Sequence, residues 1–337
     1  MKKVVTLNDI AKAANVSMNT VSKVLNGKGA ISESTKKKIL AIAREYDYHP
    51  NIIARTMRGL ESPLIGVVVS DMEDPFFVKV ISGIEQRAWK EGMSIIIGNS
   101  AEDLEKQRLC IENHLSYGCR NMIVMPVNED PAPMRALQEK NIRLVLADRL
   151  VQFEEEFHRV TVDNKKGAFD ACEYLIGMGH AKVAIINQQS IVTTETDRTD
   201  GYKEALKKHG IPVRDEYVRL AKNEEEAAQA AAQLMRLPDK PTALFIAKDR
   251  LSLHVVRALN ETGVIMPDDL SVMIYGCPHW SQTFRPFFTC MQRPIKEIGV
   301  TAAEMIIDMI QNGTDQIVHQ KYFSASLMER DTVKKLN

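Results

Sequence analysis

Apolar and polar positions alternate with a helical period over the first 50 residues. Three runs, at residues 7–14, 17–25 and 33–46, repeat their apolar side chains at spacings of three and four, which predicts three short helices with a shared core. Ser17 and Ser32 are placed to cap the second and third helices. The positions expected to face the core are Leu7, Ile10, Ala11, Ala14, Val21, Val24, Leu25, Ile39, Leu40, Ile42 and Ala43. A short break between the first two helices is typical of a helix-turn-helix motif.

The helical pattern stops at Pro50, which cannot continue a helix. The segment that follows, "NIIARTMRGLES" at residues 51–62, is compatible with a helix but has few residues to pack against. We therefore expect a linker that folds only when something holds it.

Beyond Pro63, near-continuous apolar runs alternate with amphipathic ones. "LIGVVVS" and "NMIVMPV" have the composition of buried strands, and "PFFVKVISGIEQRAWKEG" that of an amphipathic helix. This alternation predicts parallel sheets covered by helices. A second series begins at Ala168 and ends with a strand before Gly276. We therefore expect an α/β fold of two lobes, with a ligand cleft at the carboxyl ends of the strands.

The composition narrows the class of protein. The chain has 337 residues, 45% of them hydrophobic and 26% charged, which fits a globular protein of two or three domains. The longest apolar runs fall short of a membrane span and no secretory leader opens the chain, so we expect a cytoplasmic protein. The five cysteines form no C-x-x-C pair and no metal-ligand spacing. We expect reduced, mostly buried thiols and no metal or cofactor.

The net charge of zero conceals a split along the chain. Residues 1–60 hold 11 Lys and Arg against 4 Asp and Glu, whereas the remainder holds 33 against 40. Segregated charge suits a protein whose basic end meets a polyanion. The alternative is an ordinary basic tail, but a tail lacks the hydrophobic periodicity of this segment.

Eight segments, in order, resemble the lactose-repressor (LacI) family of bacterial helix-turn-helix transcription regulators over roughly residues 5–330. The resemblance implies a helix-turn-helix DNA-binding domain at 1–50, a hinge helix or linker at 51–62, and a two-lobed, periplasmic-binding-protein-like α/β domain at 63–337. It implies that this last domain binds an effector and dimerises. The segments are "TLNDIAKAANVSMNTVSKVLNG", "YHPNIIARTM", "LIGVVVSDMEDPFF", "VLADR", "VDNKKGAFDACEYLIGMGH", "RTDGYKEAL", "PTALFIAKD" and "GVIMPDDLSV".

For DNA, the resemblance puts the second helix in the major groove, with Met18, Asn19 and Lys23 where the family varies its operator-reading residues. Asn can pair with adenine, Lys with guanine, and Met can pack on a thymine methyl. The family often has Arg at the position of Lys23, and Lys cannot make its two-pronged contact. Other residues match positions that grip phosphates or cap helices near them, and both roles stay open because they use the same groups. These are Thr6, Ser17, Thr20, Asn26, Ser32, Thr35 and Tyr48.

The hinge is the second expected DNA element. In the family, the segment matching "NIIARTM" folds on specific DNA, pairs with its dimer mate in the minor groove and wedges a Leu into the central base step. Met57 stands at that position and is apolar and flexible enough to intercalate. Asn51, Ala54 and Arg55 match the flanking contacts. The alternative is an interdomain linker with an incidental Met.

The expected effector cleft departs from the family pattern. Arg198 matches an arginine that commonly binds the effector, and Arg149, with Asp148, matches the family's Asp-Arg pair. Two family side chains that bond neutral sugar hydroxyls are missing, because Lys248-Asp249 replaces Asn-Asp and Gly276 replaces Asp. Arg149, Arg198 and Lys248 together suit an anionic effector such as a sugar phosphate or sugar acid. The alternative is that Lys248 faces solvent or pairs with a carboxylate.

Aromatic residues complete the expected cleft. Phe76 and Phe77 match an aromatic pair near its mouth, one of them expected in the core. Trp280 could stack on a sugar ring or simply pack after a strand.

The sequence thus predicts a DNA-binding regulator, a repressor, that acts as a homodimer on a pseudo-palindromic operator and responds to a carbohydrate-type effector. It would be cytoplasmic, and associated with the nucleoid when bound to DNA. No GxGxxG turn, P-loop, GxSxG or HExxH motif indicates an enzyme. The alternative is a cytoplasmic small-molecule binding protein or enzyme without sequence-specific DNA binding.

Overall fold

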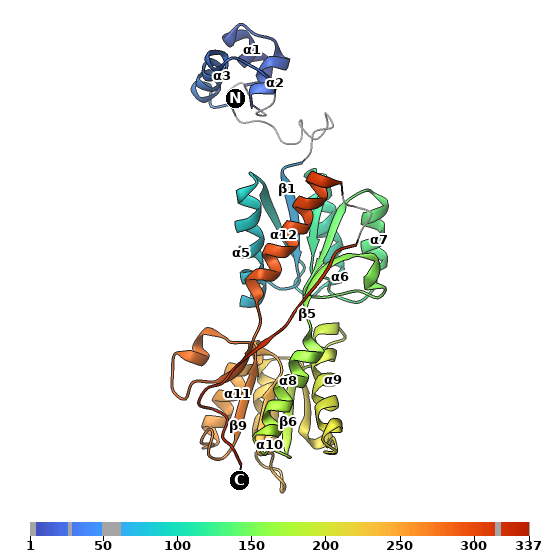
Figure 1. The fold of residues 1–337 in the computed structure, drawn as a ribbon, viewed down its shortest axis with the longest axis vertical. Helices are drawn as coiled ribbons and strands as arrows, with labels where there is room; N and C mark the ends of the chain where they lie inside the picture. The colour runs from blue at the N-terminus through green and yellow to red at the C-terminus, as the bar shows by residue number, and fades with distance from the viewer. Residues whose placement is uncertain (1–4, 26–28, 49–61, 314–317, 337) are drawn as a thin grey trace. The chain divides into compact units, whose positions relative to one another are not determined.

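The computed structural model describes residues 5–25, 29–48, 62–313 and 318–336. The chain divides into two compact units, Met1–Ser62 and Pro63–Asn337 (Figure 1).

Three helices form the first unit, where the apolar period predicts them. They are α1 (Leu7–Ala14), α2 (Met18–Leu25) and α3 (Glu33–Glu45). Asn15 ends α1 in the left-handed conformation, with a φ of 55°, and the Val16 N–H donates to the Ala11 carbonyl at 3.0 Å. This turn closes the helix-turn-helix.

The core of the first unit is smaller than the apolar pattern indicates. Its fully buried members are Ile10, Ala11, Ala14, Val21, Val24, Ile39 and Ala43. Leu40, expected to be buried, is instead 42% exposed. Helix α3 packs on the core through Ile39 and Ala43, which lie four residues apart on one face. Leu40 is one position further along the helix, so its side chain lies outside that face.

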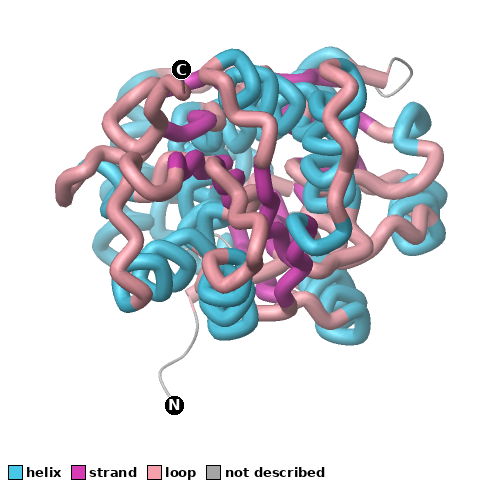
Figure 2. Tube along the Cα trace, turned by 90° about the horizontal axis from the view of Figure 1, so that it is seen from below, coloured by secondary structure: helices cyan, strands magenta, loops and turns pink. Residues whose placement is uncertain are grey.

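Two six-stranded sheets build the second unit, each the centre of one lobe (Figure 1). Seen from below, the strands lie among the helices that cover them (Figure 2). In the first sheet, of order β11-β5-β4-β3-β1-β2, neighbouring strands run parallel throughout the described residues. Its strands are β1 (Leu64–Val69), β2 (Ser94–Asn99), β3 (Asn121–Val124), β4 (Arg143–Ala147), β5 (His158–Val162) and β11 (Gln320–Phe323). Its helices are α5 (Pro75–Lys90), α6 (Leu104–Ser116), α7 (Ala132–Glu139) and α12 (Ile295–Asn312).

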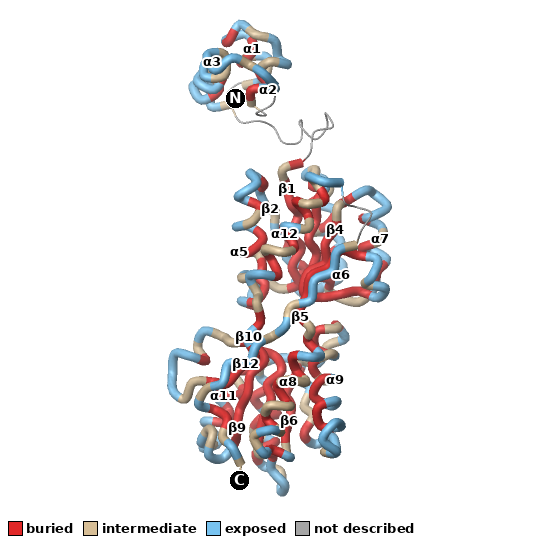
Figure 3. The backbone as a smooth tube through the Cα atoms, in the orientation of Figure 1, coloured by how far each residue is buried: buried red, intermediate tan, exposed pale blue. Residues whose placement is uncertain are grey.

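The second sheet, of order β12-β10-β9-β8-β6-β7, is parallel except that β12 runs antiparallel to β10. Its strands are β6 (Val183–Gln188), β7 (Val218–Ala221), β8 (Ala243–Ile246), β9 (Ser271–Tyr275), β10 (Thr289–Gln292) and β12 (Ser326–Met328). Its helices are α8 (Asn164–Gly177), α9 (Thr193–Lys208), α10 (Glu224–Leu234) and α11 (Asp249–Glu261). Strands β1, β3, β8 and β9 are buried along their whole length, as their largely apolar sequences require (Figure 3).

The chain passes between the lobes three times, between β5 and α8, between β10 and α12, and between β11 and β12. The apolar pattern predicts neither β5 nor any element after Gly276, so it misses that α12 returns to the first lobe. There α12 packs along α5 (Figure 1). The helices meet at Gly83 and Gly299, where an added Cβ would lie 2.2 Å from the Lys296 carbonyl and 2.0 Å from the Val80 carbonyl. Only glycine allows this close approach.

The expectation that all five cysteines are thiols is wrong for two of them. Cys277, just after β9, and Cys290, on the adjacent strand β10, form a disulfide with a Cα–Cα distance of 5.8 Å. Neighbouring parallel strands bring the two residues together, which sequence spacing alone does not reveal. Cys110, Cys119 and Cys172 are free, and burial raises the pKa of each thiol.

Candidate functional site

The outer face of α2 carries the three residues expected to read DNA bases. Met18 is 55% exposed, and Asn19 and Lys23 are exposed as well. Val21 and Val24, on the opposite face, are buried in the core of the unit. The helix therefore presents a surface of mixed apolar and hydrogen-bonding groups, which is what contact with base edges requires.

Hydroxyl groups cap the helices of the first unit. The N–H groups of Asp9, Thr20 and Thr35 donate to the hydroxyls of Thr6, Ser17 and Ser32 at 3.3, 3.1 and 3.3 Å, respectively. The capping role of these residues is thus accounted for by geometry. Helix N-termini also attract anions, so a phosphate contact at the same positions stays a prediction.

The remaining expected DNA contacts are only partly described. Tyr48 is half-buried and packs against the core of the first unit. The other five fall outside the described residues. They are Asn26, Asn51, Ala54, Arg55 and Met57.

In the second unit, charged side chains gather where the two lobes meet, and we call them the interlobe charge cluster. Arg149, Lys248 and Arg293 each follow the carboxyl end of a strand, β4, β8 and β10 respectively. The cluster comprises Asp74, Glu102, Arg149, Glu195, Arg198, Lys248, Asp249 and Arg293. The strands that precede these residues run parallel within each sheet, so their carboxyl ends lie at the same edge of the sheet. The cluster therefore lies at the usual ligand position of open α/β sheets.

Lys248 pairs with carboxylates from both lobes. Its Nζ lies 3.1 Å from Glu195 Oε1 and 3.8 Å from Asp74 Oδ2, and Lys248 is buried. Burial alone would raise the pKa of Glu195, but the charges of Lys248, Arg198 and Arg149 hold that pKa well below its usual range. The alternative that Lys248 pairs with a carboxylate is therefore correct for this structure.

Arg198 is the most enclosed cation of the cluster, with 1% of its surface exposed. Its Nε donates to Asn164 Oδ1 at 3.0 Å and its Nη1 to the Ala247 carbonyl at 2.9 Å. The guanidinium lies over the Tyr275 ring, 4.5 Å from the centroid. Glu195, three residues earlier on α9, is 4.0 Å away. The arginine is thus fixed from several elements of the second lobe.

Arg149 forms a two-pronged ion pair with Glu102. Nη1 and Nη2 each lie 2.6 Å from a carboxylate oxygen of Glu102. The guanidinium also lies over the Phe77 ring, 5.7 Å from the centroid, and Nη1 is 3.4 Å from the Pro126 carbonyl. The preceding residue, Asp148, has a φ of 63°, and burial raises the pKa of its carboxyl group.

Arg293 pairs with Asp249 at 2.9 Å and lies over the Phe76 ring, 4.5 Å from its centroid. Phe76 belongs to α5 of the first lobe, so this contact joins the lobes. Burial would raise the pKa of Asp249, but Arg293 and Lys248 lower it. Within the described residues, the buried Nε of Arg293 and the buried hydroxyl of Tyr275 have no hydrogen-bond partner. Such groups are costly to bury unless something else satisfies them.

Comparison with known proteins agrees with both units. Residues 6–51 match the family model "Bacterial regulatory proteins, lacI family", and residues 172–333 match "Periplasmic binding protein-like domain". The chain is 31% identical over 341 residues to the "Probable HTH-type transcriptional repressor ExuR" of Bacillus subtilis, covering 98% of this chain and 99% of that protein. It is 30% identical over 314 residues to catabolite control protein A of Priestia megaterium, covering 92% and 94%.

The chain belongs to the LacI family of bacterial regulatory proteins. It is a DNA-binding transcriptional repressor and not an enzyme. The fold agrees, because the structure of the lac repressor dimer bound to operator and the anti-inducer ONPF matches 98% of this chain and 100% of that chain. The TM-score is 0.86 at 24% identity. Among the described residues, no helix has the length and apolar character needed to cross a membrane.

The structure gives a physical reason for one departure of this LacI-family chain from the family pattern. Gly276 has a φ of 111°, and a Cβ added there would lie 2.6 Å from Asp249 Oδ2. The Asp249 carboxylate, held by Arg293, fills the space that a side chain at position 276 would need. Glycine at 276 and the Asp249–Arg293 pair therefore belong together.

The aromatic residues divide between the cluster and the core. The rings of Phe76 and Phe77 are buried in the core of the first lobe, in an edge-to-face contact at 5.2 Å, and each also lies beneath a cluster arginine. Trp280 instead contacts Phe288 edge-to-face at 5.0 Å and packs on the core of the second lobe. Packing therefore accounts for Trp280.

Of the cluster residues, the sequence indicates Asp249 and three of the cations, but not the carboxylates Asp74, Glu102 and Glu195 or the cation Arg293. Glu195 stands three residues before Arg198, a helical spacing that could have revealed it. Asp74 precedes Pro75 in the quoted "DPFF" and caps α5 by accepting from the Phe76 N–H at 2.9 Å. Arg293 lies beyond Gly276, where the apolar pattern predicts no helix or strand. Glu102 carries no local signal, since only the fold brings it to Arg149.

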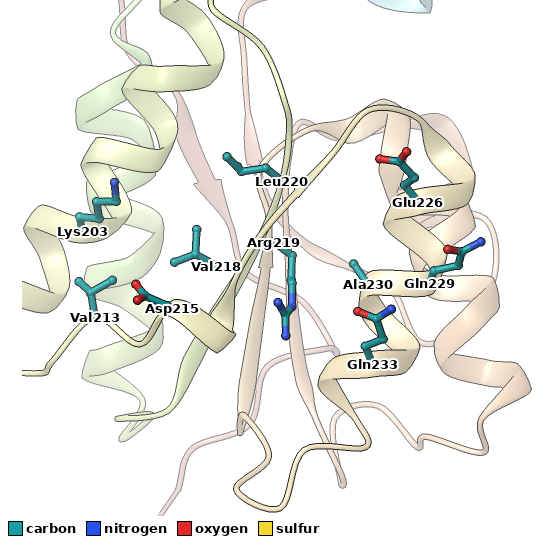
Figure 4. Close-up of a pocket in the computed structure, with 10 residues that line it drawn as sticks. All are labelled: Lys203, Val213, Asp215, Val218, Arg219, Leu220, Glu226, Gln229, Ala230 and Gln233. Carbon is teal, nitrogen blue, oxygen red and sulfur yellow. The ribbon is translucent and has the colours of Figure 1, made fainter.

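A separate surface pocket lies on the second lobe, at the edge strand β7 (Figure 4). Its volume is about 630 Å³, and α9 and α10 provide part of its wall. Its lining is Lys203, Val213, Asp215, Val218, Arg219, Leu220, Glu226, Gln229, Ala230 and Gln233. None of these residues belongs to the interlobe charge cluster.

Proposed function

We propose that this LacI-family repressor binds its operator or is released from it in response to a small carbohydrate that carries an acidic group. The observation behind the effector is the burial of four cations in the interlobe charge cluster, three of which follow the carboxyl ends of strands. They are Arg149, Arg198, Lys248 and Arg293. Charged side chains are seldom buried unless they are paired or take part in binding, and clusters of them favour a functional site.

An acidic group suits this site because arginine forks bind carboxylates and phosphates in a planar, two-pronged arrangement. A neutral sugar would have to use the same cations through weaker, uncharged acceptors. The neutral sugar is nevertheless the second candidate, because Lys248 already holds the buried carboxylate of Glu195, and Arg293 the partly buried carboxylate of Asp249. An effector that bears an acid must therefore compete with carboxylates of the protein.

On the DNA side, we propose that residues 1–50 form the DNA-binding domain, with Met18, Asn19 and Lys23 reading bases. The capping hydroxyls would also hold phosphates. Residues 51–62 would form the hinge helix, with Met57 wedged into the minor groove beside contacts from Asn51, Ala54 and Arg55. Two chains would place two such domains on the half-sites of a pseudo-palindrome, through dimerisation of residues 63–337.

The switch follows from a ligand that touches both lobes. Lys248 joins Glu195 of the second lobe to Asp74 of the first, so a ligand that alters these pairs alters the preferred arrangement of the lobes. A ligand shifts such an equilibrium only by its difference in affinity for the two arrangements. The first lobe would transmit the change to the hinge and so to the operator.

The DNA function is tested by retardation of a palindromic fragment, selected from a random pool with the purified protein. We expect binding to fall steeply with salt, since each phosphate contact releases counterions. A protein that leaves every fragment unretarded at low salt would overturn the proposal. The effector is tested by calorimetric titration with sugar acids, sugar phosphates and the parent neutral sugars. Tight binding of a neutral sugar alone would favour the second candidate.

A further inference from the structure

Among the carboxylates that pair with cations of the interlobe charge cluster in the described chain, Glu102 is the exposed one. Its side chain is 43% exposed, whereas that of its partner Arg149 is only 6% exposed. The side chains of Glu195, Asp74 and Asp249 are 3%, 6% and 16% exposed. Glu102 can therefore leave its arginine and be hydrated, whereas Glu195 and Asp74 would stay buried, and Asp249 largely buried, without a partner.

The backbone holds Glu102 at Arg149. Ala101 and Glu102, in the turn between β2 and α6, have φ values of 50° and 58°. Residues other than glycine rarely adopt this left-handed backbone conformation. The Glu102 N–H donates to the Ser70 carbonyl at 2.8 Å, and the Ala101 N–H to Asn99 Oδ1 at 3.2 Å. The turn thus directs the Glu102 carboxylate at Arg149. Among the described cluster pairs, this is the one whose carboxylate is exposed to solvent.

We propose that Glu102 occupies the subsite for the acidic group of the effector, and that an effector carboxylate replaces it on Arg149. The proposal rests on the acidic effector of the proposed function and adds the place where its acid binds. An incoming carboxylate repeats the same two-pronged geometry, so Arg149 loses no hydrogen bond in the exchange. The charge around Arg149 also stays the same, which spares the protein an uncompensated buried charge.

The exchange has a route to the rest of the molecule. Ser70, which accepts from the Glu102 N–H, is followed by Asp71, and Asp71 pairs with Arg250 of the second lobe. Release of Glu102 frees the turn that rests on Ser70, next to this link between the lobes. Glu102 is thus both the competitor that the effector displaces and the group whose release reports that the site is filled.

The test is calorimetric titration of the full-length protein with D-galacturonate, D-glucuronate, the parent hexoses and glucose 6-phosphate. The variants are Glu102→Ala and Glu102→Gln, with Glu105→Ala as the matched control, because Glu105 pairs with Arg108 on the surface of α6. We expect both Glu102 variants to bind a sugar acid about tenfold more tightly than the native protein, which corresponds to about 1.4 kcal/mol. The parent hexose and the Glu105→Ala variant should show no such gain.

The outcomes separate the two proposals. If a sugar acid binds the native protein and neither Glu102 variant gains affinity, the subsite is wrong while the acidic effector stands. If the Glu102 variants bind glucose 6-phosphate tenfold more tightly than the native protein does, but bind the sugar acids no more tightly, the subsite takes a phosphate and the carboxylate exchange is wrong. If no acid binds the native protein or the variants, and a neutral hexose does, the acidic effector itself is wrong and the subsite falls with it. Circular dichroism of each variant checks that it is folded.

Discussion

The carboxylate of Asp249 occupies the space next to the α-carbon of Gly276, so that a methyl group added to Gly276 would lie 2.6 Å from Asp249 Oδ2. Arg293 fixes the carboxylate from the other side at 2.9 Å. Gly276 follows β9, Arg293 follows β10 and Asp249 begins α11, so the three residues fix one another's positions at the carboxyl ends of the strands of the second sheet.

A Gly276→Ala variant should lose about 2–4 kcal/mol of unfolding free energy, because the methyl group meets a fixed carboxylate and φ is unfavourable. Urea unfolding followed by circular dichroism measures the loss. Gly263→Ala is the matched control, since Gly263 also has a positive φ, 78°, but its added Cβ meets nothing within 4 Å. The Gly263→Ala variant should lose only about 1 kcal/mol of unfolding free energy. Equal losses in the two variants would show that the contact with Asp249 contributes nothing.

A Glu195→Gln variant should be less stable than the native protein by about 3 kcal/mol at pH 7, because Lys248 loses its nearest buried counter-charge. The pKa of Glu195 is depressed in the folded state, so its contribution is complete above its ordinary pKa of 4.5 and is lost as the pH falls toward the folded pKa. The difference between the proteins should therefore be constant from pH 8 to 5 and narrow below pH 4.5. A difference that widens in acid would contradict the pairing. Glu156→Gln, at a surface pair with Arg135, should show a much smaller change.

Asp197 should change the stability of the protein with pH in the opposite sense to Glu195. Burial, together with the charges of Asp200 and Asp163, raises its pKa to about 6. A raised carboxyl pKa means that ionisation destabilises the folded state, so the protein should gain stability as the pH falls from above 6 toward 4. Asp197→Asn should therefore be more stable at pH 7.5 by about 1 kcal/mol, after allowance for solvent screening of this partly exposed group. The advantage should vanish near pH 4. Asp170→Asn, at a surface pair with Lys166, is the control, and it should keep the gain in stability that Asp197 gives the native protein as the pH falls through 6.

Arg250 holds the lobes together from the side of α11. It pairs with Asp71 of the first lobe and, at 2.5 Å, with Glu224 of its own lobe. Arg250→Gln should shift the population of lobe arrangements about fivefold, as loss of about 1 kcal/mol implies. Energy transfer between dyes on the two lobes measures the shift. Arg257→Gln, on the same helix but paired with Glu225 and Glu261 of the second lobe, should leave the transfer efficiency unchanged. A change of equal size in both variants would assign the effect to α11 itself.

The parts of the fold that sequence could predict are those with a local cause. Buried parallel strands such as β1 and β8 are continuous apolar runs, and α1 to α3 follow a helical period with capping hydroxyls at their starts. The return of α12 to the first lobe has no local cause, since its apolar face would suit either sheet. The contacts of α5 with α12, through Gly83 and Gly299, join positions more than two hundred residues apart in the chain.

The same distinction holds for the candidate site. Arg149, Arg198 and Lys248 could be named because they stand at recognisable positions in the chain. Their partners could not, because whether a cation is free or paired depends on residues brought in from other elements. Lys248 meets Asp74 from the opposite lobe, and Arg149 meets Glu102 across 47 positions of sequence. The cations therefore belong to paired groups, and any acidic ligand has to enter by exchange.

The surface of α2 gives a prediction that separates base reading from general DNA affinity. Asn19 is exposed and makes no part of the core, so Asn19→Ala should leave the unit folded. If Asn19 reads an adenine, its loss should lower the ratio of operator to random-DNA affinity by about 5–150-fold, equivalent to about 1–3 kcal/mol. Affinity for random DNA should hardly change, because that affinity comes from phosphate contacts. Retardation titrations with both DNAs at fixed salt measure the ratio, and Asn8→Ala, at an exposed asparagine on α1, is the matched control. An equal loss on both DNAs would mean that Asn19 contacts the backbone, whereas a loss confined to the operator and absent from Asn8→Ala would establish α2 as the reading helix.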